Sequence, residues 1–173
     1  MDDTISFRPL ARLDFPLLHR WLAQPHVVAW WNEPLDLAAI EKKYGPRVDG
    51  IEPTHTFIIE YGGQPIGWIQ WYRWSDYRAH AAQLGAEVKS AGIDLAIGEQ
   101  EMTGRGLGPR VIRQFLDQFV FADCAITAVV SDPGVNNVRS VRAFEKAGFN
   151  ISHQVKLRGE EFQRYVVRLE RRD

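Results

Sequence analysis

The strongest constraint on the fold is one strand, turn and helix pattern in the middle of the chain. Gly92–Glu99 is a largely apolar run with one carboxylate, Asp94, in its middle, which predicts a buried strand. Residues 103–108 form a glycine-rich turn, and Arg110–Phe121 carries apolar residues at helical spacing. The pattern predicts a phosphate cradle, because the first N–H groups of a helix point outward and glycines let an anion approach the backbone.

Two familiar phosphate-binding motifs are excluded at this turn. No Lys-Ser or Lys-Thr pair follows the last glycine, Gly108, so the turn is not a P-loop. The G-x-G-x-x-G spacing of a dinucleotide fingerprint is not met either. On the local pattern alone, a plain connection whose glycines serve close packing stays open beside the phosphate cradle.

The composition is that of one domain with a substantial core. The chain has 173 residues and a formal net charge of −1, which gives no reason to expect a nucleic-acid partner. Its one cysteine, Cys124, lies in an apolar run, so we expect a small buried side chain and no disulfide. The five histidines show no metal-ligand spacing, and no membrane-length apolar run or signal peptide is present. We therefore expect a cytoplasmic monomer or homodimer without metal.

The rest of the chain is predicted to form a mixture of strands and helices. Strands are predicted at 4–9, 54–61, 66–72, 92–99, 124–131, 149–156 and 162–169. Helices are predicted at 13–23, 35–44, 110–121 and 138–147, with a short one after Pro25 and a weaker one within 77–88. Hairpins mixed with crossover helices predict an α/β (α+β mixed) fold with a mixed sheet and helices on both faces.

Two segments carry a family resemblance. The turn Thr103–Gly108 and the helix that opens at Asn137 and ends in Phe144–Phe149 resemble the GCN5-related N-acetyltransferase (GNAT) superfamily. Within it the chain is similar to aminoglycoside 6'-N-acetyltransferases through Pro25–Trp31, Tyr44–Pro46, Gln64–Gln70, Gly92–Asp94 and Asp132–Pro133. The resemblance covers nearly the whole chain and implies one GNAT-type domain over residues 1–173. It also implies a mostly antiparallel sheet whose central parallel strands splay apart.

The resemblance implies acetyl-coenzyme A as the acetyl donor. Its pyrophosphate would lie on the backbone of the turn, and its pantetheine arm would pair with the edge of a strand. A backbone N–H near Ala96 or Ile97 would stabilise the developing oxyanion. The residues expected to bind the coenzyme are Leu95, Ala96, Ile97, Thr103, Gly104, Arg105, Gly106, Leu107, Gly108, Asn137 and Phe144.

Two positions depart from the superfamily pattern. Thr103 stands where Arg or Gln is usual, so one side-chain contact to the pyrophosphate is missing. Phe144 stands where a tyrosine commonly protonates the departing thiolate, and a phenyl ring cannot do so. A thiolate is a tolerable leaving group, because the pKa of a thiol is only about 8.5. We therefore expect reduced or altered efficiency, with a non-catalytic binding module as the alternative.

Asp94 is the candidate catalytic residue. An ammonium has no lone pair, so a nearby carboxylate must bind the amine and help to remove a proton. A lone acid in an apolar strand is costly unless it faces a polar site, although alternation along a strand also allows an outward-facing residue.

The acceptor is expected to be a small cationic amine, for which the resemblance points to the 6'-amine of an aminoglycoside. Six tryptophans, several in two clusters, offer faces that suit sugar rings and cations. The residues expected to bind the acceptor are Trp30, Trp31, Tyr44, Gln70, Tyr72, Trp74, Asp94 and Asp132, with Glu33 and Glu52 as further carboxylates. Lysine, siderophore or protein amines are the rival acceptors, and core packing is the rival role for any single tryptophan.

Overall fold

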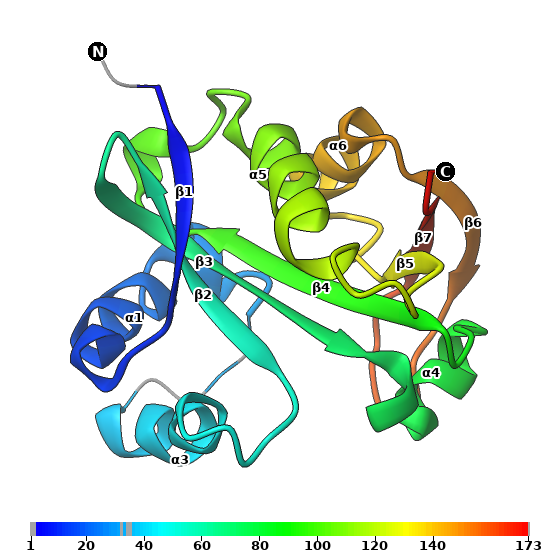
Figure 1. Ribbon diagram of the computed structural model, residues 1–173, viewed down its shortest axis with the longest axis horizontal. Coiled ribbons are helices and arrows are strands. Elements are labelled where there is room, and N and C mark those ends of the chain that lie inside the picture. The colour runs from blue at the N-terminus through cyan, green and yellow to red at the C-terminus, as the bar shows by residue number, and fades with distance from the viewer. Residues whose placement is uncertain (1–2, 32, 34–35, 173) are drawn as a thin grey trace. The chain divides into compact units, whose positions relative to one another are not determined.

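The computed structural model describes residues 3–31, 33 and 36–172 and contains one seven-stranded sheet (Figure 1). Its hydrogen-bonded order is β1-β2-β3-β4-β5-β7-β6. The strands are β1 (Ile5–Pro9), β2 (His55–Tyr61), β3 (Gln64–Arg73), β4 (Ser90–Ile97), β5 (Ala128–Ser131), β6 (Asn150–Val155) and β7 (Arg164–Glu170). β4 and β5 run parallel, whereas β1 with β2, β5 with β7 and β6 with β7 are antiparallel. The prediction of a mixed, mostly antiparallel sheet with a central parallel pair is confirmed.

The chain divides into two compact units, the first made of Met1–Gln70 and Asp94–Arg105. This unit holds α1 (Phe15–Leu22), α2 (Pro25–Val28) and α3 (Leu37–Val48). Its core is built on large rings: Trp21 stacks on Trp68 with centroids 6.0 Å apart, and both are fully buried. Trp21 and Trp68 therefore pack the core of this unit and offer no face to a ligand.

The expected end of the third helix at Gly45-Pro46 is wrong. The prediction began at Leu35, outside the described residues, and ended at Tyr44, but α3 continues through Pro46 to Val48. A proline inside a helix loses one hydrogen bond, which tertiary contacts here offset. Tyr44 is fully buried, and the carbonyl of Pro46 accepts the amides of Ile51 and Glu52 at 2.9 and 3.1 Å.

The hairpin between β2 and β3 is tighter than expected. The predicted turn spans residues 62–65, but β3 already begins at Gln64. Gly62 and Gly63 have φ of 56° and 75°, the left-handed values that a two-residue turn of this kind requires. Only glycine adopts both at no steric cost, so this dipeptide fixes the hairpin register.

The second unit consists of Trp71–Ile93 and Gly106–Asp173. It contains α4 (Arg78–Leu84), α5 (Leu107–Phe115) with a π-helical continuation over Leu116–Val120, and α6 (Val138–Ala147). In Figure 1, α5 and α6 lie side by side. The predicted signals of α6 are both observed, since the Asn137 side chain accepts the Ser140 amide at 3.3 Å and Gly148 ends the helix with φ of 105°.

Two expectations about residues 110–131 are corrected. The helix predicted from Arg110 begins at Leu107, and the strand predicted from Cys124 begins at Ala128. Cys124 is exposed, not buried, because it lies on a turn that Asp123 closes by accepting the amide of Ala125 at 3.0 Å. None of the helices described is long and apolar enough to cross a bilayer.

Candidate active site

The glycine turn before α5 has the backbone of an anion cradle. Gly104 and Gly106 have φ of 73° and 75°, and a Cβ built on either would meet nothing within 4 Å. These glycines are therefore required by backbone conformation and leave open space beside them. Gly106 is the residue before the first turn of α5 and has no side chain with which to cap its N–H groups. An anion at this helix start would satisfy those donors.

Packing explains the third glycine. A Cβ on Gly108 would stand 3.2 Å from the Cβ of Ala143 on α6, so glycine here allows the two helices to approach closely. Leu107 beside it is 3% exposed and belongs to the core, whereas Thr103 is half-buried and Arg105 is exposed. The Thr103 hydroxyl donates to the carbonyl of Gln100 at 2.7 Å, which stabilises the start of the turn.

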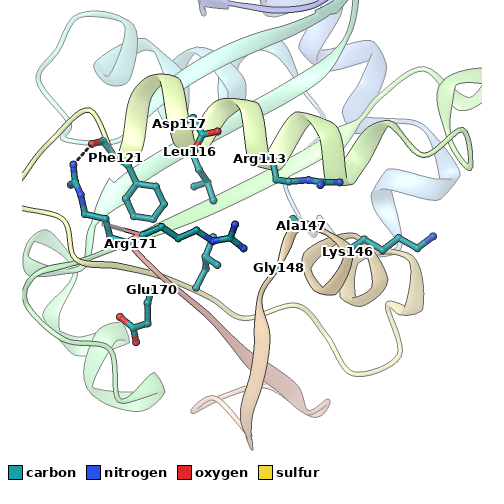
Figure 2. A pocket seen from close by; sticks show the side chains of 11 residues that line it. Arg113, Leu116, Asp117, Phe121, Lys146, Ala147, Gly148, Glu170 and Arg171 are labelled. Atoms are coloured by element: carbon teal, nitrogen blue, oxygen red, sulfur yellow. Dashed lines mark hydrogen bonds between the residues drawn. The ribbon is translucent and has the colours of Figure 1, made fainter.

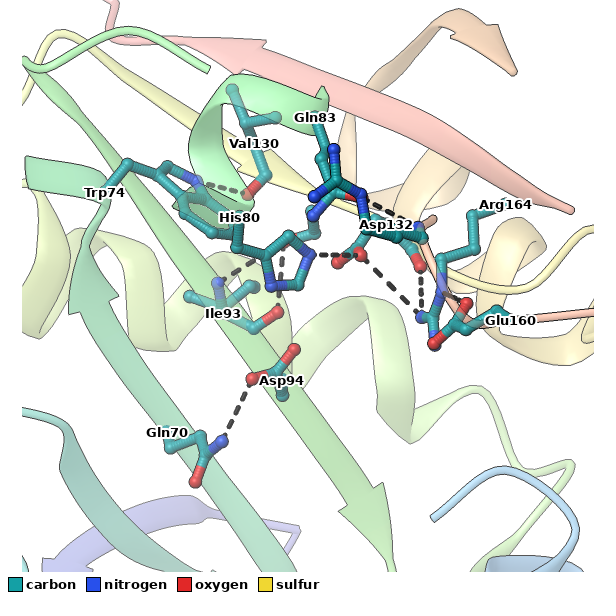
Figure 3. A network of polar contacts seen from close by, with 12 residues as sticks. Gln70, Trp74, His80, Gln83, Ile93, Asp94, Val130, Asp132, Glu160 and Arg164 are labelled. Carbon is teal, nitrogen blue, oxygen red and sulfur yellow. Dashed lines mark hydrogen bonds and ion pairs between the residues drawn. The ribbon is translucent and has the colours of Figure 1, made fainter. Parts of the chain in front are cut away.

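The parallel pairing of β4 with β5 covers a short register. Ser90 and Ala91 lie opposite Ala128 and Val129. At Ile93 the contact passes to a side chain: the Ser131 hydroxyl donates to the Ile93 carbonyl at 3.0 Å and accepts its amide at 3.3 Å (Figure 3). A side chain that replaces backbone pairing holds strands farther apart than a ladder does, so β4 and β5 separate at Ile93.

The following part of β4, Leu95–Ile97, is half-buried and packs closely on one side. A Cβ on Gly67 of β3 would stand 2.1 Å from the carbonyl oxygen of Ala96, so no other residue fits at Gly67 without a shift. The carbonyl of Ile97 accepts the Nε2–H of His26 at 2.9 Å. His26 therefore ties α2 to the end of β4, at the residues expected to hold the pantetheine arm.

Asp94 is linked to Arg47 by two successive hydrogen bonds through Gln70, all within the first unit. Its Oδ2 accepts the Gln70 amide nitrogen at 2.9 Å (Figure 3), and the Gln70 amide oxygen accepts Arg47 Nη1 at 2.7 Å. Arg47 also pairs with Glu52 at 3.1 Å through Nε. Gln70 is 6% exposed, while Asp94 is half-buried. A carboxylate that lies beside a neutral amide and remains partly open suits the binding of an amine.

Tyr44 lies in the same unit and is fully buried, with its hydroxyl 3.0 Å from Glu33 Oε2. Burial, together with the charge of Glu33, raises the pKa of the Tyr44 phenol well above its usual value. Glu33 is in turn paired with Lys43, and the Arg47 guanidinium lies 5.1 Å from the centre of the Tyr44 ring. Tyr44 therefore stays neutral, and its hydroxyl donates a hydrogen bond to Glu33 while its ring contacts Arg47.

In the second unit the predicted acceptor residue Asp132 is engaged by the chain itself. His80 Nε2 lies 3.0 Å from Asp132 Oδ2, and Arg164 donates to the Asp132 carbonyl at 2.9 Å (Figure 3). Trp74 is 1% exposed, and its indole N–H donates to the carbonyl of Val130 at 3.0 Å. These contacts give Trp74 a packing role and fix Asp132 between two basic side chains.

The other predicted aromatic residues differ in exposure. Trp30 is 45% exposed, and Trp31 is half-buried with its ring edge-on to Trp68 at 5.0 Å. Tyr72 is 8% exposed, and its ring leaves no space for a Cβ on Gly92. Phe144 is 3% exposed and meets Phe149 edge-on at 5.0 Å. Trp30 thus has the most accessible ring among the predicted aromatic residues.

A cavity of about 330 Å³ in the second unit is lined by none of the predicted site residues (Figure 2). It is lined by α5 and the π-helical segment, by the C-terminal end of α6 and by the end of β7, with Arg113, Asp117, Lys146 and Arg171 around it. Arg171 donates to the carbonyls of Phe121, Asp123 and Ile126. Cations beside helix C-termini satisfy terminal carbonyls, so a structural role accounts for this cluster.

The described residues also contain no group of three or more His, Cys, Asp or Glu that could hold a metal.

Comparison with known proteins identifies the family. The family model for the acetyltransferase (GNAT) domain matches residues 11–157. The chain belongs to the GNAT acetyltransferase family. The predicted resemblance and the predicted enzyme class are therefore confirmed, and acetyl-coenzyme A is the donor that this family uses.

Individual relatives and solved structures show which members of the family the chain is similar to. The chain is 30% identical over 152 residues to an aminoglycoside N(6')-acetyltransferase type 1 of Klebsiella pneumoniae, covering 86% of this chain and 75% of that protein. A structure of AAC(6')-Ib with paromomycin and acetyl-coenzyme A superposes with a TM-score of 0.82 at 27% identity, covering 98% and 94% of the two chains. A lysine N-acyltransferase MbtK of a Mycobacterium species is 23% identical over 135 residues, 78% of this chain and 54% of that protein.

The residues of this GNAT chain fit its coenzyme. The two left-handed glycines leave open space, α5 starts without a side-chain cap, and Ser131 separates β4 from β5. The Asn137 side chain already caps α6, so an interaction with the coenzyme would add to that role. The individual binding residues stay predictions, as does the extent of one domain over residues 1–173.

Sequence reasoning missed three residues that contact predicted site residues of their own unit: Arg47, His26 and His80. Each acts on a partner far along the chain, such as Gln70 for Arg47 or Asp132 for His80. Their local patterns carry no signal, because an arginine near a helix end and isolated histidines are common on protein surfaces. Only the tertiary fold reveals these partners.

Proposed function

We propose that this chain transfers the acetyl group of acetyl-coenzyme A to a primary amine of a small cationic acceptor, and that the acceptor is the 6'-amine of an aminoglycoside. The reaction forms a C–N bond to the carbonyl carbon and breaks the thioester C–S bond. The amine loses a proton, and the thiolate leaves as the thiol of coenzyme A. This proposal goes beyond family membership in naming the acceptor and the residues.

The observation that carries the proposal is the partly open carboxylate of Asp94 in the middle of β4. Asp94 would bind the ammonium form of the acceptor and help to remove its proton, directly or through water. Its contact with the neutral amide of Gln70 supports this role, because the carboxylate keeps its charge while it is held in one orientation. Charge on Asp94 would also concentrate cationic acceptors near the thioester.

The coenzyme would be held by backbone groups of the glycine turn and of β4. The N–H groups at the start of α5 would bind its pyrophosphate, and Arg105 would add a positive charge. Leu95–Ile97 would pair with the pantetheine arm, because β4 leaves β5 at Ile93. The absence of a phenol at Phe144 means that solvent or the acceptor's own proton would neutralise the departing thiolate.

Aminoglycosides suit the open aromatic face of Trp30 and the partly open carboxylate of Asp94. The similarity to proteins that carry this activity in their names supports the same acceptor.

One contact pattern favours a second candidate, an acceptor with a single amine such as a lysine derivative. Glu33 and Glu52 are already paired with Lys43 and Arg47, which leaves less negative charge for a polycation.

Release of the free thiol from acetyl-coenzyme A against a panel of amines tests the proposal. Turnover with kanamycin or tobramycin at a KM below that for lysine derivatives is the expected result. Turnover confined to lysine derivatives or to protein amines would reject the aminoglycoside. Thermal stabilisation by coenzyme A without turnover of any amine would reject catalysis while leaving the binding site.

A further inference from the structure

We propose that Arg47 is a positioning residue for acetyl transfer. It fixes the side-chain amide of Gln70 in the one orientation that donates an N–H to Asp94. This inference rests on the proposed role of Asp94 as the group that receives the acceptor amine. It assigns a function to a residue of α3 that lies two hydrogen bonds away from the carboxylate.

The direction of the hydrogen bonds follows from donor and acceptor chemistry. A guanidinium can only donate, so the atom of Gln70 that lies 2.7 Å from Arg47 Nη1 must be the amide oxygen. The amide nitrogen then faces the other way, where it lies 2.9 Å from Asp94 Oδ2. If the Gln70 amide turned over, N–H groups would face Arg47 and an oxygen would face a carboxylate. Both contacts would become repulsive, and Gln70 is too buried for water to replace them easily.

Arg47 is itself held in place from three sides. Its side chain is 11% exposed and leaves α3 in the last turn of that helix. Its Nε donates to Glu52 at 3.1 Å, and its guanidinium lies 5.1 Å from the centre of the Tyr44 ring. The amide of Glu52 is bonded to the carbonyl of Pro46, which anchors the loop that carries the partner carboxylate. A guanidinium with this many partners is preorganised, so it can impose its orientation on Gln70.

The consequence for catalysis is a carboxylate with a fixed direction and a favoured ionised form. An N–H donor stabilises the charged state of Asp94 over the protonated state. It also holds the carboxylate in one orientation on β4. Misplacement of a reacting group by about 1 Å can cost about a hundredfold in rate.

Arg47→Met tests the inference, because it keeps an unbranched apolar stem and removes every donor. We expect kcat with the best amine from the panel to fall about ten- to a hundredfold. The KM for acetyl-coenzyme A should stay within about twofold, since its binding does not involve the Gln70 amide. The acid limb of the pH profile of kcat/KM should move upward, because the carboxylate loses a hydrogen bond that favours its charged form. Arg47→Lys retains one donor and should recover part of kcat.

A double-mutant cycle with Gln70→Ala separates positioning from a general structural effect. If Arg47 acts through Gln70, Arg47→Met should change kcat by less than about twofold in the Gln70→Ala background. Equal losses in both backgrounds, or an unmoved acid limb, would overturn the inference.

Three further variants complete the experiment. Arg12→Met is the matched control, because Arg12 also contacts α3 through two carboxylates, Glu41 and Asp49, and should leave kcat unchanged. Glu52→Gln weakens one anchor of Arg47 but keeps the Arg47–Gln70 hydrogen bond, so it should lower kcat less than Arg47→Met does, and a larger loss would overturn the relay through Gln70. Asp94→Asn separates the two levels of the proposal. Full turnover in that variant would reject the proposed role of Asp94, whereas low turnover with an additive cycle would reject Arg47 alone.

Discussion

The hydroxyl of Ser131 takes the place of a backbone partner for Ile93. It donates to the carbonyl of Ile93 at 3.0 Å, accepts its amide at 3.3 Å, and is 2% exposed. The side chain thus satisfies two buried backbone groups at the point where β4 and β5 separate. A gap between parallel strands is costly unless such groups find partners, so Ser131 makes the gap stable.

Ser131→Ala should therefore weaken both the fold and the binding of coenzyme A. Two buried backbone groups would lose their partner, and we expect the free energy of unfolding to fall by about 1–3 kcal/mol. Isothermal titration calorimetry with coenzyme A should show an affinity several-fold lower. Ser131→Thr retains the hydroxyl, so its stability and its affinity for coenzyme A should lie between those of the wild type and of Ser131→Ala. Unchanged affinity in a stably folded Ser131→Ala protein would contradict the role of this residue.

Gly106→Ala should impair the turn without any steric clash. A Cβ at this position would meet nothing within 4 Å, but φ of 75° costs a non-glycine residue about 1–2 kcal/mol. The turn would relax away from that conformation, and the KM for acetyl-coenzyme A should rise about tenfold. Gly50→Ala is the matched control, because Gly50 has φ of 71° and the same open surroundings outside the turn. That variant should lose similar stability and keep the KM, and an equal rise in KM would contradict the assignment.

The sequence predicted elements whose signals are local. α6 was predicted to within a residue at both ends, because Asn137 caps it and Gly148 terminates it in a left-handed conformation. The glycine turn before α5 was recognised for the same reason. In these places each residue's own conformational preference agrees with the fold.

Elements whose limits depend on distant contacts were predicted less well. Pro46 marked the end of α3 in the sequence, but burial of Tyr44 and the contacts of Arg47 carry the helix past it. The same holds for the site. Asp94 stood out as an acid in an apolar strand, whereas Arg47 could not be assigned, because its partner Gln70 is 23 residues away in sequence.

Phe144→Tyr should preserve or raise turnover. The ring is 3% exposed and packs edge-on against Phe149 at 5.0 Å, so the added hydroxyl must find a partner or lose up to about 1–3 kcal/mol of stability. If that hydroxyl reaches the departing sulfur, it can supply the proton that a phenyl ring cannot. Steady-state kinetics with acetyl-coenzyme A measure kcat, and thermal unfolding measures the structural cost. A folded variant without activity would show that the pocket requires the phenyl ring.

The stability of the chain should fall in acid partly through Asp14. Burial alone would raise the pKa of this carboxyl, but hydrogen bonds from Arg8 and from the Ala11 amide lower it below its usual value. A lowered pKa in the folded state contributes stability above pH about 4, and that contribution is lost as the pH falls through the folded-state value.

Asp14→Asn should therefore lower the free energy of unfolding by about 1–3 kcal/mol at pH 7 and by much less near pH 2. Urea unfolding at pH 7, 5 and 3 measures the difference. Asp117→Asn, at an exposed position, serves as the control and should show a small difference at every pH. A constant difference between wild type and Asp14→Asn across this range would contradict the assignment.

Asp94→Ala should lower turnover by about two to four orders of magnitude, because it removes the group that binds the amine and accepts its proton. The affinity for coenzyme A should stay nearly unchanged, since the predicted pyrophosphate contacts come from the backbone of the glycine turn. The half-buried Asp94 side chain also accepts the Gln70 amide, so stability should change by about 1 kcal/mol at most. Asp132→Ala provides the comparison: because Asp132 is already engaged by His80 and Arg164, its loss should lower kcat far less than the loss of Asp94 does. Equal turnover in Asp94→Ala and the wild type would remove Asp94 from the reaction and with it the reason for the Arg47–Gln70 relay.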